Sequence, residues 1–129
     1  MARNVQRSVH LGRCLCGAVR FEAQGPAKWT GWCHCESCRR HTGAPVSAFA
    51  GFEREMVSIR GEAFSRFASS PGVQRGFCAR CGSTLTYEGE RWPTEIHLHV
   101  GLFDRPEDFA PQGEAFSEER VAWVHLAPS

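Results

Sequence analysis

The sequence has no long hydrophobic run and no segment typical of export. No apolar stretch approaches the roughly 20 residues that a helix needs to cross a bilayer. The first residues, MARNVQRSVHLGR, carry arginines but neither an apolar core segment nor a cleavage site of small residues. We therefore expect no membrane partner and a cytoplasmic location, where thiols stay reduced.

An excess of charge of one sign is also lacking. The formal net charge is +1 at pH 7, with acidic and basic residues mixed along the chain, so nothing predicts nucleic acid as a partner. The sequence contains no G-x-S-x-G element, no phosphate-binding glycine loop and no dinucleotide fingerprint. The enzyme classes that depend on those elements have no support.

What is present has the composition of an ordinary soluble globule. With 129 residues, 42% of them hydrophobic and 22% charged, the chain is long enough for one modest core but not for two. We expect a flexible N-terminus over residues 1–8, which are polar, and a single domain over residues 9–129. The sequence leaves the oligomeric state open, including a homodimer.

Several short segments alternate apolar and polar residues, or are rich in strand-forming residues, as strands do. These segments are 18–23, 46–52, 56–59, 64–68, 73–77, 84–87 and 95–100. The turn signal SSPG at 69–72 predicts a hairpin of 64–68 with 73–77. In 95–100, the alternation predicts that His97 and His99 point outward.

Two helical turns are expected between the strands. The first follows Cys38 and ends at Gly43, because Pro45 lacks the amide to continue it. The second covers 104–110, where Asp104 and Glu107 have capping-box spacing. The fold class is therefore predicted to be mostly β with short helical turns.

The seven cysteines are grouped two, three and two, which favours metal binding over disulfides. Cys78-x-x-Cys81 is followed by Gly82, and such a turn places two sulfurs on one zinc. It supplies half of a tetrahedron, and Cys14 and Cys16 form a matching half. A structural zinc there would link distant parts of a small domain, because metal binding energy is also folding energy.

The central group Cys33, Cys35 and Cys38 then remains for a second zinc. Three protein ligands and one open position are typical of a catalytic zinc. Closure of the site by His34 or His41 instead would make the chain a non-catalytic module with two zincs. Such a module would bind a partner. A pairing of the central group with one outer pair is a third arrangement that spacing alone leaves open.

An open site with three thiolates would favour soft sulfur substrates over hydrolysis, because the thiolates weaken zinc as a Lewis acid. Arg39 and Arg40 follow Cys38 directly and could receive a substrate carboxylate. Trp29, Trp32 and Trp92 are expected in the core or at the rim rather than as a stacking platform.

Four stretches of the sequence together resemble the glutathione-dependent formaldehyde-activating enzyme family. In order they read LGRCLCGAVRFEA, WCHCESCRRHTGAPVSAF, SSPGVQRGFCARCGSTLTYEGERWP and GLFDRPEDFAP. The resemblance runs from about Leu11 to Trp123, and the three cysteine groups make it specific. It implies a β-tent zinc fold of small antiparallel sheets.

The resemblance also implies two zincs and a carbon–sulfur lyase activity. Glutathione, a small thiol, would add to formaldehyde to give S-hydroxymethylglutathione, and the reverse cleavage would use the same site. The implied structural zinc ligands are Cys14, Cys16, Cys78 and Cys81, and the implied catalytic ones are Cys33, Cys35 and Cys38.

The chain departs from the family pattern at three positions. His41 stands where the family often has a small residue, Glu114 where a histidine is common, and Leu102 where a small hydroxyl residue is usual. We expect Arg39, Arg40 and His41 to contact substrate, unless His41 becomes a fourth zinc ligand. In that case the chain would be a non-catalytic module that binds a partner or carries glutathione.

Overall fold

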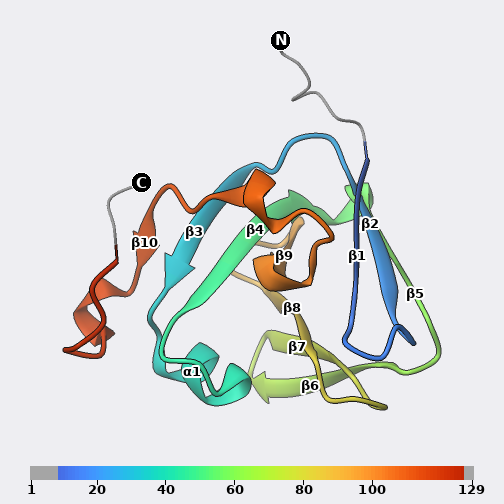
Figure 1. Ribbon diagram of the computed structural model, residues 1–129. Helices are drawn as coiled ribbons and strands as arrows, with labels where there is room; N and C mark the ends of the chain where they lie inside the picture. The colour runs from blue at the N-terminus through green and yellow to red at the C-terminus, as the bar shows by residue number, and fades with distance from the viewer. Residues whose placement is uncertain (1–8, 127–129) are drawn as a thin grey trace, which may run out of the picture.

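The computed structural model describes residues 9–126 and is mostly β, as the alternating segments predicted (Figure 1). The predicted flexible segment 1–8 and the last three residues of the predicted domain 9–129 lie outside this described part. No helix within residues 9–126 has the length and apolarity needed to span a membrane.

The strands form a three-stranded and a seven-stranded sheet. The smaller sheet has the order β1 (Val9–Arg13), β2 (Arg20–Gln24), β5 (Val57–Arg60). The larger sheet has the order β10 (Glu114–Ala115), β3 (Trp29–Cys33), β4 (Ser47–Glu53), β9 (Glu95–His99), β8 (Thr84–Gly89), β7 (Val73–Cys78), β6 (Phe64–Ser70). Neighbouring strands are antiparallel, except that β10 runs parallel to β3.

The helical segments are short and lie at strand ends. The only α-helix among residues 9–126 is α1 (Glu36–Thr42), which follows β3. It ends at Gly43, whose φ of 76° lies in the left-handed region that favours glycine. The remaining segments are 3-10 turns at Arg54–Met56, Val100–Leu102, Pro106–Phe109 and Ser117–Glu119.

An aromatic core joins the two sheets. Phe21 comes from β2 and Phe52 from β4, while Phe103 and Phe109 follow β9. The Phe103 ring centroid lies 5.1 Å from that of Phe21, 4.2 Å from that of Phe109 and 6.2 Å from that of Phe52. Full burial of such a side chain contributes about 1.5–3 kcal/mol, so these rings hold the smaller sheet against the larger one.

The strand predictions are largely confirmed, including the hairpin of β6 and β7 and the turn that ends at Gly43. Three strands were not predicted: β1, β3 and β10. The sequence of β3, Trp29-Thr-Gly-Trp-Cys33, does not alternate, and β10 has only two residues.

The outward orientation predicted for His97 and His99 is wrong. Their exposed fractions are 5% and 8%. Alternation indicates a solvent face only when one side of the sheet is uncovered. Here β9 lies between β4 and β8. Aromatic rings, among them Phe49 and Tyr87, cover its histidine side.

Candidate functional site

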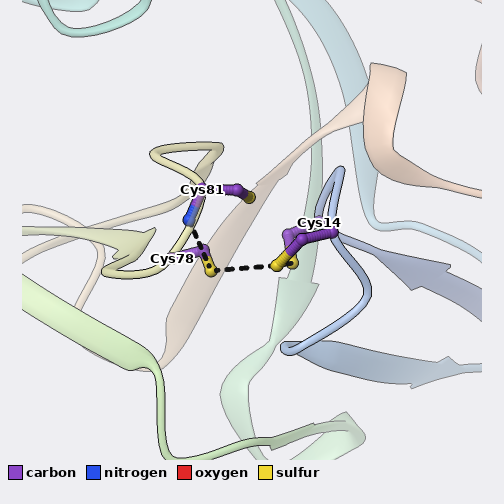
Figure 2. Close-up of side chains that lie close together, drawn as sticks. Cys14, Cys78 and Cys81 are labelled. Atoms are coloured by element: carbon purple, nitrogen blue, oxygen red, sulfur yellow. Dashed lines mark hydrogen bonds between the residues drawn. The ribbon is translucent and has the colours of Figure 1, made fainter.

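The two outer cysteine pairs meet in one cluster. Cys14 and Cys16 lie in the turn between β1 and β2, and Cys78 and Cys81 lie where β7 turns into β8. Their four sulfurs all lie within 4.8 Å of one another. Figure 2 shows Cys78 and Cys81 facing Cys14 across the gap between these turns. The cluster therefore links the smaller sheet to the larger one.

The spacing of these sulfurs fits a tetrahedral metal. The sulfur of Cys16 lies 3.7 Å from that of Cys14 and 3.9 Å from that of Cys78. Two sulfurs that are each about 2.3 Å from a tetrahedral zinc would be about 3.8 Å apart. The residues present thus fit a closed four-sulfur site.

Backbone amides stabilise negative charge on these sulfurs. The amides of Arg80 and Cys81 donate to Cys78 Sγ at 3.3 and 3.4 Å. Gly82 has a φ of 84°, the positive value expected after the second cysteine of such a turn. Hydrogen bonding to the side chain and backbone of Ser83 lowers the pKa of Cys81 to about 5.

The central cysteines form a second cluster. Cys33 ends β3, Cys35 is the N-cap of α1, and Cys38 lies in the first turn of that helix. The sulfurs of Cys33 and Cys38 are 3.7 Å apart, and the Cys38 amide donates to Cys35 Sγ at 3.3 Å. Among residues 9–126, the metal-ligating atoms grouped here are these three sulfurs alone.

Contact among the three thiols separates their pKa values. Hydrogen bonds from Cys33 and Cys38 lower the pKa of Cys35 to about 2. Hydrogen bonds to Cys35 and Cys38 raise the pKa of Cys33. The neighbouring S–H groups stabilise the first thiolate, and its charge then opposes a second ionisation. A cation at this position would relieve that opposition.

Arg75 on β7 supplies positive charge beside the second cluster. Its side chain is buried, and Nη1 lies 3.4 Å from Cys38 Sγ. Nε donates to Ser69 Oγ at 3.1 Å, and the guanidinium carbon lies 5.1 Å from the Tyr87 ring centroid. Among residues 9–126, no carboxylate forms a salt bridge with Arg75. A buried guanidinium needs an anionic partner, and this contact acts to lower the pKa of the Cys38 thiol, whereas the contact with Cys35 and burial keep that pKa above its usual value.

The second cluster opens into a pocket of about 590 Å³, a volume within the usual range for small-molecule sites. All three cysteines line it, together with Arg75 and Arg91. The lining also holds six large aromatic side chains, Trp29, Trp32, Phe49, Tyr87, Trp92 and Phe116. None of the four cysteines of the first cluster lines this pocket.

The residues predicted to bind substrate lie on α1, outside the lining of this pocket. Arg40 Nε pairs with Glu36 at 2.8 Å, and Arg39 is half-buried. His41 lies beside His99, with ring centroids 6.4 Å apart, and its Nδ1 is buried without a hydrogen-bond partner.

The other histidine near the cluster, His34, is buried. Its Nε2 lies 2.8 Å from Glu114 Oε1 on β10. Glu114 therefore contacts a residue that lies between two of the cysteines in the sequence.

Sequence reasoning missed Arg75 and Tyr87. One signal was available for Arg75. It lies two residues from both Val73 and Phe77, and side chains two positions apart on a strand share a face, so Arg75 is on the same face as these apolar residues. The contact of Arg75 with Cys38, which is 37 positions away in the chain, has no local signature.

Comparison with known proteins supports the same architecture. A crystal structure of a Rhodobacter sphaeroides protein superposes with a TM-score of 0.66 at 23% identity, over 81% of this chain and 99% of that one. This likeness concerns the fold.

Two curated relatives add sequence similarity. An uncharacterized lyase of Schizosaccharomyces pombe is 29% identical, over 85% of this chain and 92% of its own length. A putative glutathione-dependent formaldehyde-activating enzyme of Halomonas elongata is 30% identical, over 89% of this chain and 79% of its own length. The family profile described as "Glutathione-dependent formaldehyde-activating enzyme" matches residues 9–119. The chain therefore belongs to the glutathione-dependent formaldehyde-activating enzyme family.

Proposed function

We propose that this protein is a zinc-dependent carbon–sulfur lyase that joins a small thiol to an aldehyde and cleaves the adduct. Glutathione and formaldehyde, giving S-hydroxymethylglutathione, are the reactants that the family name suggests. The observation that carries the proposal is the second cluster: three mutually close sulfurs line a pocket of substrate size.

Each cluster would hold one zinc, since an all-sulfur donor set suits zinc. Cys14, Cys16, Cys78 and Cys81 would hold a structural ion, and Cys33, Cys35 and Cys38 a labile catalytic one. When bound at the second cluster, zinc supplies a Lewis acid that favours the thiolate form of a thiol.

The residues of the chain would position the reactants and balance charge. In the forward reaction the thiol sulfur bonds to the carbonyl carbon, and the thiol proton ends on the carbonyl oxygen. Arg75 offsets the negative charge of the cysteine thiolates through its contact with Cys38. The aromatic wall excludes water, which strengthens these electrostatic interactions.

The remaining predicted contacts stay part of the proposal. Arg39, Arg40 and His41 follow Cys38 on α1. From outside the pocket lining they would meet only the distal, charged part of a thiol such as glutathione. We also propose a cytoplasmic location, because all seven cysteines are free thiols, which persist in a reducing compartment.

The alternative, a non-catalytic module with two closed zincs, needs a fourth protein ligand at the second cluster. Neither His34 nor His41 belongs to the group of ligating atoms there. The open pocket beside the three sulfurs therefore favours the enzyme.

The proposal is tested by the rate at which free thiol and adduct interconvert. Glutathione and formaldehyde react without a catalyst, so exchange is followed by nuclear magnetic resonance at equilibrium with and without the zinc-loaded protein. We expect at least a tenfold faster exchange, lost in Cys35→Ser. Equal rates with the wild type and Cys35→Ser would contradict an enzymatic role.

Single cysteine variants test the division between structural and catalytic zinc. Cys35→Ser should retain one zinc per chain and a native circular dichroism spectrum. Cys81→Ser should unfold the chain, since loss of a structural zinc removes binding energy comparable to the total stability of a domain, about 5–15 kcal/mol. Equal loss of folding in both variants would refute this division.

Substitution of Arg75 tests its role as a positioning residue. Arg75→Met should weaken zinc binding at the second cluster about 10- to 100-fold, the range for residues that support metal ligands, and leave the first zinc unaffected. Arg75→Lys should recover part of this loss. Competition with a chromogenic chelator measures both sites.

The matched control is Arg66→Met, because Arg66 lies on the neighbouring strand β6, pairs with Glu88 and is outside the pocket lining. Unchanged affinity at the second cluster in a folded Arg75→Met protein would show that Arg75 does not support the metal.

A further inference from the structure

We infer that the aldehyde taken by this site carries an aromatic or similarly flat apolar group, so that formaldehyde is a poor fit to the pocket. This inference rests on the proposed function and names the substrate class of the same site. The adduct would be a thiohemiacetal whose apolar substituent lies against the aromatic wall, with the sulfur beside Cys33, Cys35 and Cys38.

The wall is built around His97 on β9. Its ring centroid lies 4.6 Å from that of Trp29, 5.3 Å from that of Tyr87 and 5.3 Å from that of Trp92. The Tyr87 ring is stacked on it, with an interplanar angle of 27°. Rings that support one another in this way keep their positions before a ligand enters, so the apolar surface is part of the native site.

The sheet makes room for this wall at Gly51 on β4. The register pairs Gly51 with Trp29 on one side and with His97 on the other. A Cβ at Gly51 would lie 2.2 Å from Trp29 Nε1. The absence of a side chain at this position therefore lets the Trp29 ring lie against the sheet and reach His97.

His97 contributes a ring rather than a charge to this surface. Its Nε2 lies 3.0 Å from Glu95 Oε1, and Glu95 also accepts from Trp29 Nε1 and pairs with Lys28. Burial lowers the pKa of His97, so the ring is neutral at neutral pH. Glu95 thus orients both His97 and Trp29.

The charged side chains of the lining are mostly engaged with other protein groups. Arg75 contacts Cys38, Glu36 pairs with Arg40, and Glu119 accepts from the Glu36 amide. Arg91 lies over the Trp92 ring, 5.0 Å from its centroid. Glutathione carries two carboxylates and one ammonium group, for which this lining offers few free partners.

The size of the reactants gives the same indication. Formaldehyde has a single carbon and leaves the aromatic rings without a partner. A phenyl group fills such a surface, and its full burial contributes enough free energy to raise affinity by roughly tenfold or more. The apolar wall is therefore matched by the substituent of a larger aldehyde.

A matched series of aldehydes tests the inference in the zinc-loaded wild-type protein. Formaldehyde, acetaldehyde and phenylacetaldehyde are compared with one small uncharged thiol, 2-mercaptoethanol, by the same equilibrium exchange measurement. Acetaldehyde and phenylacetaldehyde differ by the phenyl group. We expect kcat/KM to be at least tenfold higher for phenylacetaldehyde than for acetaldehyde, mainly through a lower KM.

A variant of the wall separates pocket contacts from chemical reactivity. Trp92→Ala should lower kcat/KM for phenylacetaldehyde at least fivefold more than it lowers kcat/KM for acetaldehyde, because the phenyl group makes the larger contact with this ring. The control is Trp123→Ala, because Trp123 is 70% exposed and does not line the pocket. That variant should keep the full preference, and circular dichroism checks that both variants are folded.

The outcomes distinguish this inference from the proposed function. A rate with acetaldehyde or formaldehyde equal to or above that with phenylacetaldehyde would overturn the inference and leave the lyase standing. No acceleration with any aldehyde, with either 2-mercaptoethanol or glutathione, would overturn the proposed lyase as well. A preference for phenylacetaldehyde that depends on Trp92 supports the inference.

Discussion

The close approach of four sulfurs from two distant turns is the constraint on which this fold depends. Cys14 and Cys16 lie at one end of the smaller sheet, and Cys78 and Cys81 lie in the larger one. Without a shared cation, four thiols at this spacing would oppose one another's ionisation. A shared cation would let the cluster connect the two sheets at a second place, in addition to the phenylalanine core. The larger sheet also holds the second cluster, which lines the pocket.

The second cluster depends on charge balance rather than on closure. Three thiolates around a divalent cation would carry one net negative charge, and the buried guanidinium of Arg75 lies beside one of them. A fourth protein ligand would close this site. Arg75 would instead balance its charge without being a ligand. It would offset the charge of the site and leave the side that faces the pocket open to a small molecule. The aromatic rings around His97 are the part of the pocket that, in our inference, selects that molecule.

Much of this arrangement could be predicted from the sequence. Cysteine spacing favoured the two groups of neighbouring sulfurs that the structure shows, because the turn at Cys78, Cys81 and Gly82 has a recognisable sequence. Alternation predicted the half-buried strands. It also predicted β9 but gave the wrong orientation for its histidines, which are buried because both faces of this strand are covered. The pocket could not be predicted, since Arg75, Tyr87 and Trp92 come together only through the strand order β9-β8-β7.

The central claim is that the chain holds one closed structural zinc and one exchangeable zinc. The most direct test is zinc per chain by mass spectrometry of metals, before and after brief mild chelation, with circular dichroism on the same samples. The account predicts two zincs that fall to one while the fold is kept. Two zincs that both resist chelation, or that leave together with loss of folding, would contradict it.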